Sequence, residues 1–89
     1  MVVAVLFFEV KDADGFRAAI AGSRDLFKDV SGFHGFELRQ GVEEPGRFLI
    51  TADWDSVDAH LAWQAAHAQE FLGALGPHVE GPPDIKHYR

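Results

Sequence analysis

The N-terminal segment is apolar on both of its faces, and this property limits the possible folds more than any other feature. Residues 2–10 are rich in β-branched and aromatic side chains, which favours a β-strand. Side chains alternate along a strand, so each face receives every second residue. One face carries Val3, Val5 and Phe7, and the other carries Val2, Ala4, Leu6 and Phe8. A strand that is apolar on both faces needs to be covered on both.

Three further strands are predicted along the chain. Residues 33–40 and 47–54 alternate in polarity, and the Glu-Glu-Pro-Gly sequence within 41–46 predicts a turn between them. A stiff Gly-Pro-Pro loop at 81–83 precedes a last short strand at 84–89.

Two helices are predicted between these strands. Asp12 or Asp14 caps the first, which continues to residues 31–32 on an apolar stripe. That stripe consists of Phe16, Ile20, Phe27 and Val30. Asp55 or Ser56 caps the second, which ends at Gly76 and has a break expected within 65–68. Its core stripe is predicted to be Val57, Leu61, Ala68, Leu72 and Leu75.

The order β-α-β-β-α-β predicts an α+β, ferredoxin-like fold, with both helices on one face of a four-stranded antiparallel sheet. With 89 residues, the chain forms one domain, residues 1–89. Two helices can cover only one face of the sheet. We therefore expect the other face to pack against a second copy in a homodimer. The alternative is a monomer with a short, core-heavy first strand.

Charge and composition exclude several classes of function. A net charge of −6 and eight scattered basic residues argue against nucleic-acid binding. The absence of cysteine excludes disulfides and thiolate chemistry. The apolar N-terminus turns polar at Glu9 and Lys11 and has no basic leader, so we expect no membrane span and a cytoplasmic protein.

A candidate pocket is predicted where the strand at 47–54 meets the second helix. Trp54 ends that strand on the same face as Ile50. The helix carries a second stripe about 100° from its predicted core centre. This stripe consists of His60, Trp63, His67 and Phe71. His60 and His67 are candidate bases, with Trp54 shaping the pocket. Alternatively, all of these residues are ordinary flanks of an amphipathic helix.

We expect the walls of this pocket to include Phe36, Ile50, Trp63 and Phe71, together with His87 on the last strand. His87 shares a strand face with Ile85 and either points into the pocket or is a satisfied buried polar group. We expect no metal, because His60 and His67 are separated by about 10 Å along the helix axis. No glycine-rich phosphate loop follows a strand, and a nucleotide or flavin module would need a longer chain. Any chemistry is therefore expected to come from the substrate, a small bound cofactor or the histidines.

Four segments together resemble the antibiotic biosynthesis monooxygenase family. They are Gly32-Phe-His-Gly-Phe-Glu-Leu-Arg39, Glu43-Glu-Pro-Gly-Arg-Phe-Leu-Ile50, Trp54-Asp-Ser-Val-Asp-Ala-His60 and Gly81-Pro-Pro-Asp-Ile-Lys-His-Tyr88. The resemblance covers nearly the full chain and implies a dimeric α/β barrel with an apolar pocket in each subunit. Trp54, His60 and His87 match positions of the family pattern, while His67 is displaced by one residue from its position.

The resemblance implies a cofactor-independent monooxygenase that oxidises an aromatic phenol- or quinol-type substrate with O₂. In such enzymes a base takes the phenolic proton, the substrate reduces oxygen, and a peroxide collapses to a quinone. Haem binding or degradation, with His67 as axial ligand, is one alternative, although the first strand lacks the asparagine of haem-degrading relatives. A non-catalytic dimeric domain that binds a small ligand is another.

Overall fold

The computed structural model describes all residues, 1–89, and confirms the predicted element order. The strands are β1 (Val2–Glu9), β2 (Phe33–Gln40), β3 (Arg47–Trp54) and β4 (Asp84–Tyr88). The helices are α1 (Ala13–Gly22) and α2 (Val57–Leu75), with short 3₁₀ helices η1 (Arg24–Phe27) and η2 (Gly76–His78). The strands form one antiparallel sheet in the order β2-β3-β1-β4.

The register of the sheet places Trp54 at the end of two neighbouring strand pairs. Trp54 lies opposite Val2 of β1 on one side and Phe33 of β2 on the other. The pairing of β2 with β3 is irregular between Phe33 and Gly35, where Gly35 has a φ of 138°. A bulge bends the strand that carries it and can redirect a side chain. This one lies beside the end of β3, where the side chain of Trp54 is buried.

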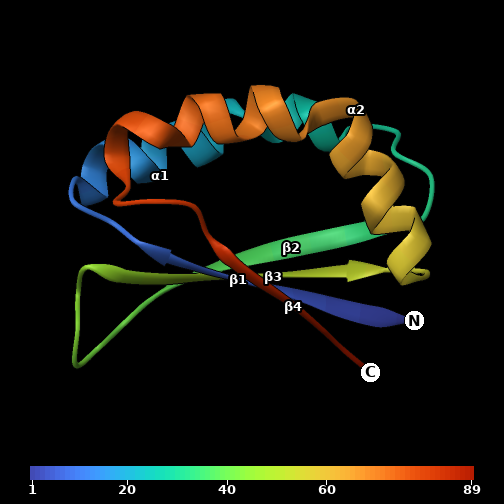
Figure 1. The fold of residues 1–89 in the computed structure, drawn as a ribbon, viewed down its shortest axis with the longest axis horizontal. Helices are drawn as coiled ribbons and strands as arrows, with labels where there is room; N and C mark the ends of the chain where they lie inside the picture. The colour runs from blue at the N-terminus through green and yellow to red at the C-terminus, as the bar shows by residue number, and fades with distance from the viewer.

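Both helices cover the same face of the sheet, and the opposite face is left open (Figure 1). The alternation predicted for β1 and β3 is confirmed, since every second side chain of each strand is buried against the helices. The buried core consists of Val2, Ala4, Leu6, Phe8, Phe16, Ile20, Phe48, Ile50, Ala52, Trp54, Trp63, Phe71 and Leu75. The core therefore lies between the sheet and the helices.

Each α-helix begins at a side-chain cap that the sequence predicts. The Asp12 carboxylate accepts a hydrogen bond from the backbone N–H of Gly15, and the Ser56 hydroxyl accepts one from Ala59. These caps satisfy backbone donors that have no partner within the helix. The cap residue Ser56 lies two residues after Trp54 and α2 begins at Val57, which brings the first turn of α2 close to the end of β3.

The predicted extent of the first helix is wrong. Helix α1 ends at Gly22, and the chain continues through η1 instead of reaching residues 31–32. Ser23 ends the helix by bonding back through its hydroxyl to the Ala19 carbonyl, and its own N–H bonds to the Ile20 carbonyl. Phe27 therefore reaches the core from a separate short element.

The predicted core stripe of the second helix is also wrong at most of its positions. Of the predicted stripe, only Leu75 is fully buried, whereas Val57, Leu61 and Leu72 are exposed. The buried positions are His60, Trp63, Phe71 and Leu75. The two aromatic rings bury more apolar surface than the aliphatic side chains would, and this sets the rotation of the helix.

The predicted break within 65–68 is absent, because α2 is one continuous helix of 19 residues. Its axis nevertheless changes direction along its length (Figure 1). Neither helix is apolar over a stretch long enough to cross a bilayer.

Candidate functional site

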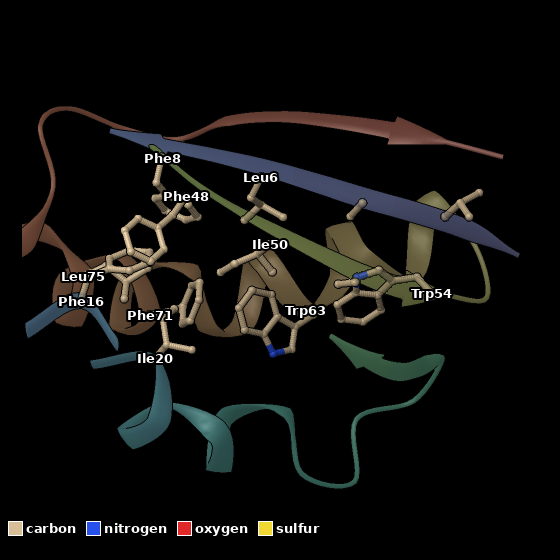
Figure 2. Close-up of a cluster of buried hydrophobic side chains, with 13 residues drawn as sticks. Leu6, Phe8, Phe16, Ile20, Phe48, Ile50, Trp54, Trp63, Phe71 and Leu75 are labelled. Carbon is tan, nitrogen blue, oxygen red and sulfur yellow. The ribbon is translucent and has the colours of Figure 1, made fainter. Parts of the chain in front are cut away.

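An apolar cavity lies between the sheet and α2. Its volume is about 20 Å³, which is room for about one water molecule. It is lined by Leu6, Phe27, Phe36, Ile50, Ala52, Trp54, His60, Trp63 and Phe71. Figure 2 shows the rings of Trp54, Trp63 and Phe71 beside the strands that carry Leu6 and Ile50. The cavity is a narrow space within an aromatic cluster.

Trp54 forms one wall of the cavity and has an unusual hydrogen-bonding state. Its side chain is 1% exposed, and its indole Nε1–H has no partner in the protein. A buried donor without an acceptor costs about 1–3 kcal/mol, and such groups are rare enough to need a physical reason. An acceptor atom on a bound molecule would remove this cost.

His60 lies against Trp54 and is the only histidine that is fully buried. Its ring stacks on the indole of Trp54, with centroids 4.9 Å apart and an angle of 22° between the planes. Burial, together with the nearby His87, lowers the pKa of His60 from 6.5 to about 4. Burial disfavours the charged imidazolium, so His60 is neutral at pH 7. Its lone pair accepts a proton only when a nearby negative charge, such as the oxyanion of a bound molecule, offsets the buried positive charge.

His60 is held by partners from two different elements. Its Nδ1 lies 2.8 Å from Nε2 of His87 on β4. Its Nε2 lies 3.4 Å from the amide nitrogen of Gln64, one turn further along α2. The short contact to His87 fixes the ring, and the long contact to Gln64 leaves Nε2 only weakly engaged.

Phe27 closes the opposite side of the cavity. Its ring stacks on Trp63 with centroids 4.5 Å apart and meets Phe71 edge-on at 5.5 Å. The indole N–H of Trp63 donates to the Leu26 carbonyl at 2.9 Å, which holds η1 against α2. Arg24, on the same 3₁₀ helix, places its guanidinium 5.0 Å from the ring centre of Phe36. The short element η1 therefore covers the aromatic cluster.

The structure brings most of the predicted site residues together. Trp54, His60, Trp63, Phe71, Phe36 and Ile50 all line the cavity. His87 lies behind His60 and contacts it. His67 does not line the cavity; it is half-buried, and its ring centre is 5.9 Å from that of Trp63.

Sequence reasoning missed Leu6, Phe27 and Ala52 of the cavity lining, and Gln64 beside His60. Phe27 was assigned to the core stripe of a longer first helix, and only the early end of α1 turns it toward the cavity. Gln64 lies four residues after His60, a spacing that places both on one helix face. This spacing could have predicted their contact. No group of three His, Cys, Asp or Glu side chains is arranged to hold a metal ion.

Two of the most similar proteins have sequences just below 30% identical to this chain. A crystal structure from Bordetella bronchiseptica that bears the name of an antibiotic biosynthesis monooxygenase is 28% identical, with a TM-score of 0.90, covering 99% of this chain and 94% of the other. SchA from Streptomyces halstedii is 29% identical in an alignment of 88 residues that covers 93% of this chain. The chain spans only 23% of the length of SchA.

A third similarity concerns the fold alone. SnoaB from Streptomyces nogalater, described as a cofactor-independent oxygenase, superposes with a TM-score of 0.84 at 19% identity, covering 99% of this chain and 90% of SnoaB.

The family model of the antibiotic biosynthesis monooxygenases matches residues 1–75, which include β1, β2, β3, the whole of α2 and every residue that lines the cavity. The chain therefore belongs to the antibiotic biosynthesis monooxygenase family.

Proposed function

We propose that this protein is a cofactor-independent monooxygenase that oxidises an aromatic, phenol- or quinol-type substrate with O₂. The observation that carries the proposal is the pair formed by His60 and Trp54. A buried neutral imidazole stacks on a buried indole whose N–H lacks an acceptor, and both line an apolar aromatic cavity. This pair offers one proton acceptor and one unused hydrogen-bond donor to a substrate that carries a hydroxyl group. Membership of the family supports the same reaction class.

The proposed reaction uses the substrate itself as the reductant. His60 accepts the phenolic proton, and the Trp54 N–H donates a hydrogen bond to the resulting oxyanion. The electron-rich ring carbon then transfers electrons to O₂, a carbon–oxygen bond forms, and the peroxide anion takes the proton back from His60 to give a hydroperoxide. His60 removes the proton on that carbon as the O–O bond breaks, which gives a carbonyl group and a hydroxide ion, and the hydroxide takes up this proton and leaves as water. One oxygen atom enters the product, and the other leaves as water.

Substrate entry requires Phe27 to move. A cavity of about 20 Å³ does not admit an aromatic ring, since ligand pockets have volumes of about 300–1,000 Å³. Phe27 is only half-buried and belongs to the four-residue element η1, whereas the other aromatic walls belong to β-strands and α2. Displacement of Phe27 from Trp63 is the change that opens the aromatic cluster with least disturbance to the sheet.

We infer that the functional unit is a homodimer that buries the open face of the sheet. This face carries Val3, Val5 and Leu49, all half-buried, and the ring of Phe7, which is 44% exposed. No segment of this chain covers that face (Figure 1). An apolar central strand next to solvent is typical of an interface, and a second copy supplies a matching surface.

The small size of the cavity favours a second candidate function, a non-catalytic dimeric domain that binds a small ligand. In that case the aromatic side chains are core residues, and His60 is a buried polar group satisfied by His87. No comparable observation favours haem binding, because His67 lies outside the cavity lining.

Oxygen consumption distinguishes the two candidates. The purified protein is mixed with a panel of anthrone- and quinol-type compounds, without added metal or flavin, in an oxygen electrode. A monooxygenase consumes one O₂ for each substrate molecule oxidised. Ligand binding detected by tryptophan fluorescence, with no oxygen uptake above the rate without protein, would instead support the ligand-binding domain.

A further inference from the structure

The hydrogen-bond directions around His60 form one consistent set. The amide nitrogen of Gln64 can only donate, so Nε2 of His60 is the acceptor in that contact. A neutral imidazole carries a single N–H, which must then lie on Nδ1. That N–H donates to Nε2 of His87 at 2.8 Å. Gln64 therefore donates to His60, and His60 donates to His87.

His87 is the only charged or titratable neighbour that lowers the pKa of His60 electrostatically. The side chains against His60 are Trp54 on β3, Trp63 and Gln64 on α2, and His87 on β4. Of these side chains, only His87 can carry a charge. His87 itself lies opposite Ala4 of β1 in the sheet register and forms no ion pair with a carboxylate.

We propose that His87 is a positioning residue that holds His60 as the Nδ1–H tautomer, and that protonation of His87 reverses this tautomer. A protonated His87 must donate from Nε2, because both of its ring nitrogens then carry hydrogen. A neutral His60 responds by accepting at Nδ1 and carrying its own proton on Nε2, and the Gln64 amide rotates to turn its oxygen toward that N–H. The pair gains one proton in this step, and the nitrogen of His60 that points away from His87 changes from acceptor to donor.

Solvent reaches the two histidines unequally, since His87 is half-buried and His60 is fully buried. Burial, together with the nearby His87, lowers the pKa of His60 to about 4, so His60 stays neutral down to about that pH. The kinetic consequence rests on the proposed function: His60 stops acting as a base when His87 is charged, at a pH where His60 is itself still neutral.

Long-range ¹H–¹⁵N NMR of the ¹⁵N-labelled protein tests the proposal without requiring activity, because the two tautomers have different ring-nitrogen shifts. At pH 7.5 we expect His60 to show the Nδ1–H pattern. As the pH falls through the protonation of His87, we expect His60 to switch to the Nε2–H pattern without gaining a second proton. An Nε2–H pattern at pH 7.5, or a His60 that never switches, would overturn the proposal.

Two variants of His87 sharpen the test. In His87→Phe the acceptor is removed, so we expect His60 to lose its single tautomer and its response to pH. In His87→Asn the amide oxygen can still accept from Nδ1–H, so we expect the Nδ1–H pattern to return without the pH switch. Gln69→Ala, at an exposed position of the same helix outside the cavity lining, is the control and should behave as the wild type.

A kinetic measurement separates this inference from the proposed function. With an oxidised substrate, His87→Phe should lower the oxygen-uptake rate at pH 7.5 by about fivefold, and His87→Asn should restore most of it. If the wild type consumes no oxygen but the NMR patterns follow the expected course, the proposed function fails and the tautomer assignment stands. If oxygen is consumed but His87→Phe leaves the tautomer of His60 unchanged, His87 is not a positioning residue.

Discussion

At the residue scale, the site depends on a histidine that is buried without being charged. His60 packs between the indole of Trp54 and the imidazole of His87, and both contacts suit the neutral ring. Protonation would place a positive charge where little water can reach it. Because the pKa of His60 is lowered to about 4 in the folded protein, the free energy of unfolding depends on pH through this residue.

The first prediction is that the protein loses stability as the pH falls from about 6.5 to about 4. In this window the unfolded chain protonates His60, whereas the folded chain does not, so the unfolded state is favoured. The loss from this residue is at most about 3 kcal/mol. Urea denaturation at several pH values measures it. In His60→Phe the loss within this window should shrink; an identical loss in both proteins would contradict the assignment.

A second prediction compares the two tryptophans. Trp63 donates its N–H to the Leu26 carbonyl, whereas the N–H of Trp54 has no partner. Replacement by Phe removes a hydrogen bond at Trp63 but removes an unsatisfied donor at Trp54. Trp63→Phe should therefore destabilise the fold more than Trp54→Phe, by about 1 kcal/mol in urea denaturation. The opposite order would indicate that the Trp54 N–H is satisfied in solution.

At the scale of secondary-structure elements, the rotation of α2 and the shortness of α1 together create the site. Helix α2 turns His60, Trp63 and Phe71 toward the sheet. Because α1 ends at Gly22, the following η1 places Phe27 over these rings. The cavity is closed by one short element that is held by a single hydrogen bond from Trp63 and by ring stacking.

A third prediction concerns Phe27. Phe27→Ala should enlarge the cavity and improve binding of an aromatic ligand, while lowering the free energy of unfolding by about 3 kcal/mol. Quenching of tryptophan fluorescence by the ligand measures binding, and urea denaturation measures stability. Leu61→Ala is the control, because Leu61 is 47% exposed and does not line the cavity. Weaker binding to Phe27→Ala than to the control would show that Phe27 is a binding wall and does not obstruct entry.

The sequence predicted the strands well and the helices less well, for physical reasons. Period-two alternation identifies the buried face of a strand directly, as in Phe48, Ile50, Ala52 and Trp54. Helix α2 has apolar residues around much of its circumference, so periodicity alone did not identify its buried face. The end of α1 depends on local bonds of Ser23, and the contact between His60 and His87 depends on tertiary packing across 27 positions. The spacing of apolar residues along the sequence predicts neither of these features.

At the scale of the whole molecule, one sheet face is covered by helices and the other is open (Figure 1). Val5 lies in the middle of β1, a central strand of the sheet, on the open face. A charge there faces water in a monomer but is buried in a dimer that uses this face.

A fourth prediction follows for Val5→Asp. Light scattering coupled to gel filtration should give a dimer for the wild type, twice the chain mass of 9.8 kDa, and a monomer for the variant. Val42→Asp is the matched control, because Val42 is 88% exposed in the turn between β2 and β3, and should remain dimeric. A monomeric wild type would refute the inferred homodimer.

The proposed reaction places one atom of O₂ in a phenol- or quinol-type substrate, with His60 as the base. Turnover under ¹⁸O₂, followed by mass spectrometry of the quinone, tests it most directly. We predict one ¹⁸O atom per product molecule, at a rate reduced about 100-fold or more in His60→Phe. A product without ¹⁸O, or an equal rate of labelled product in His60→Phe, would contradict the account.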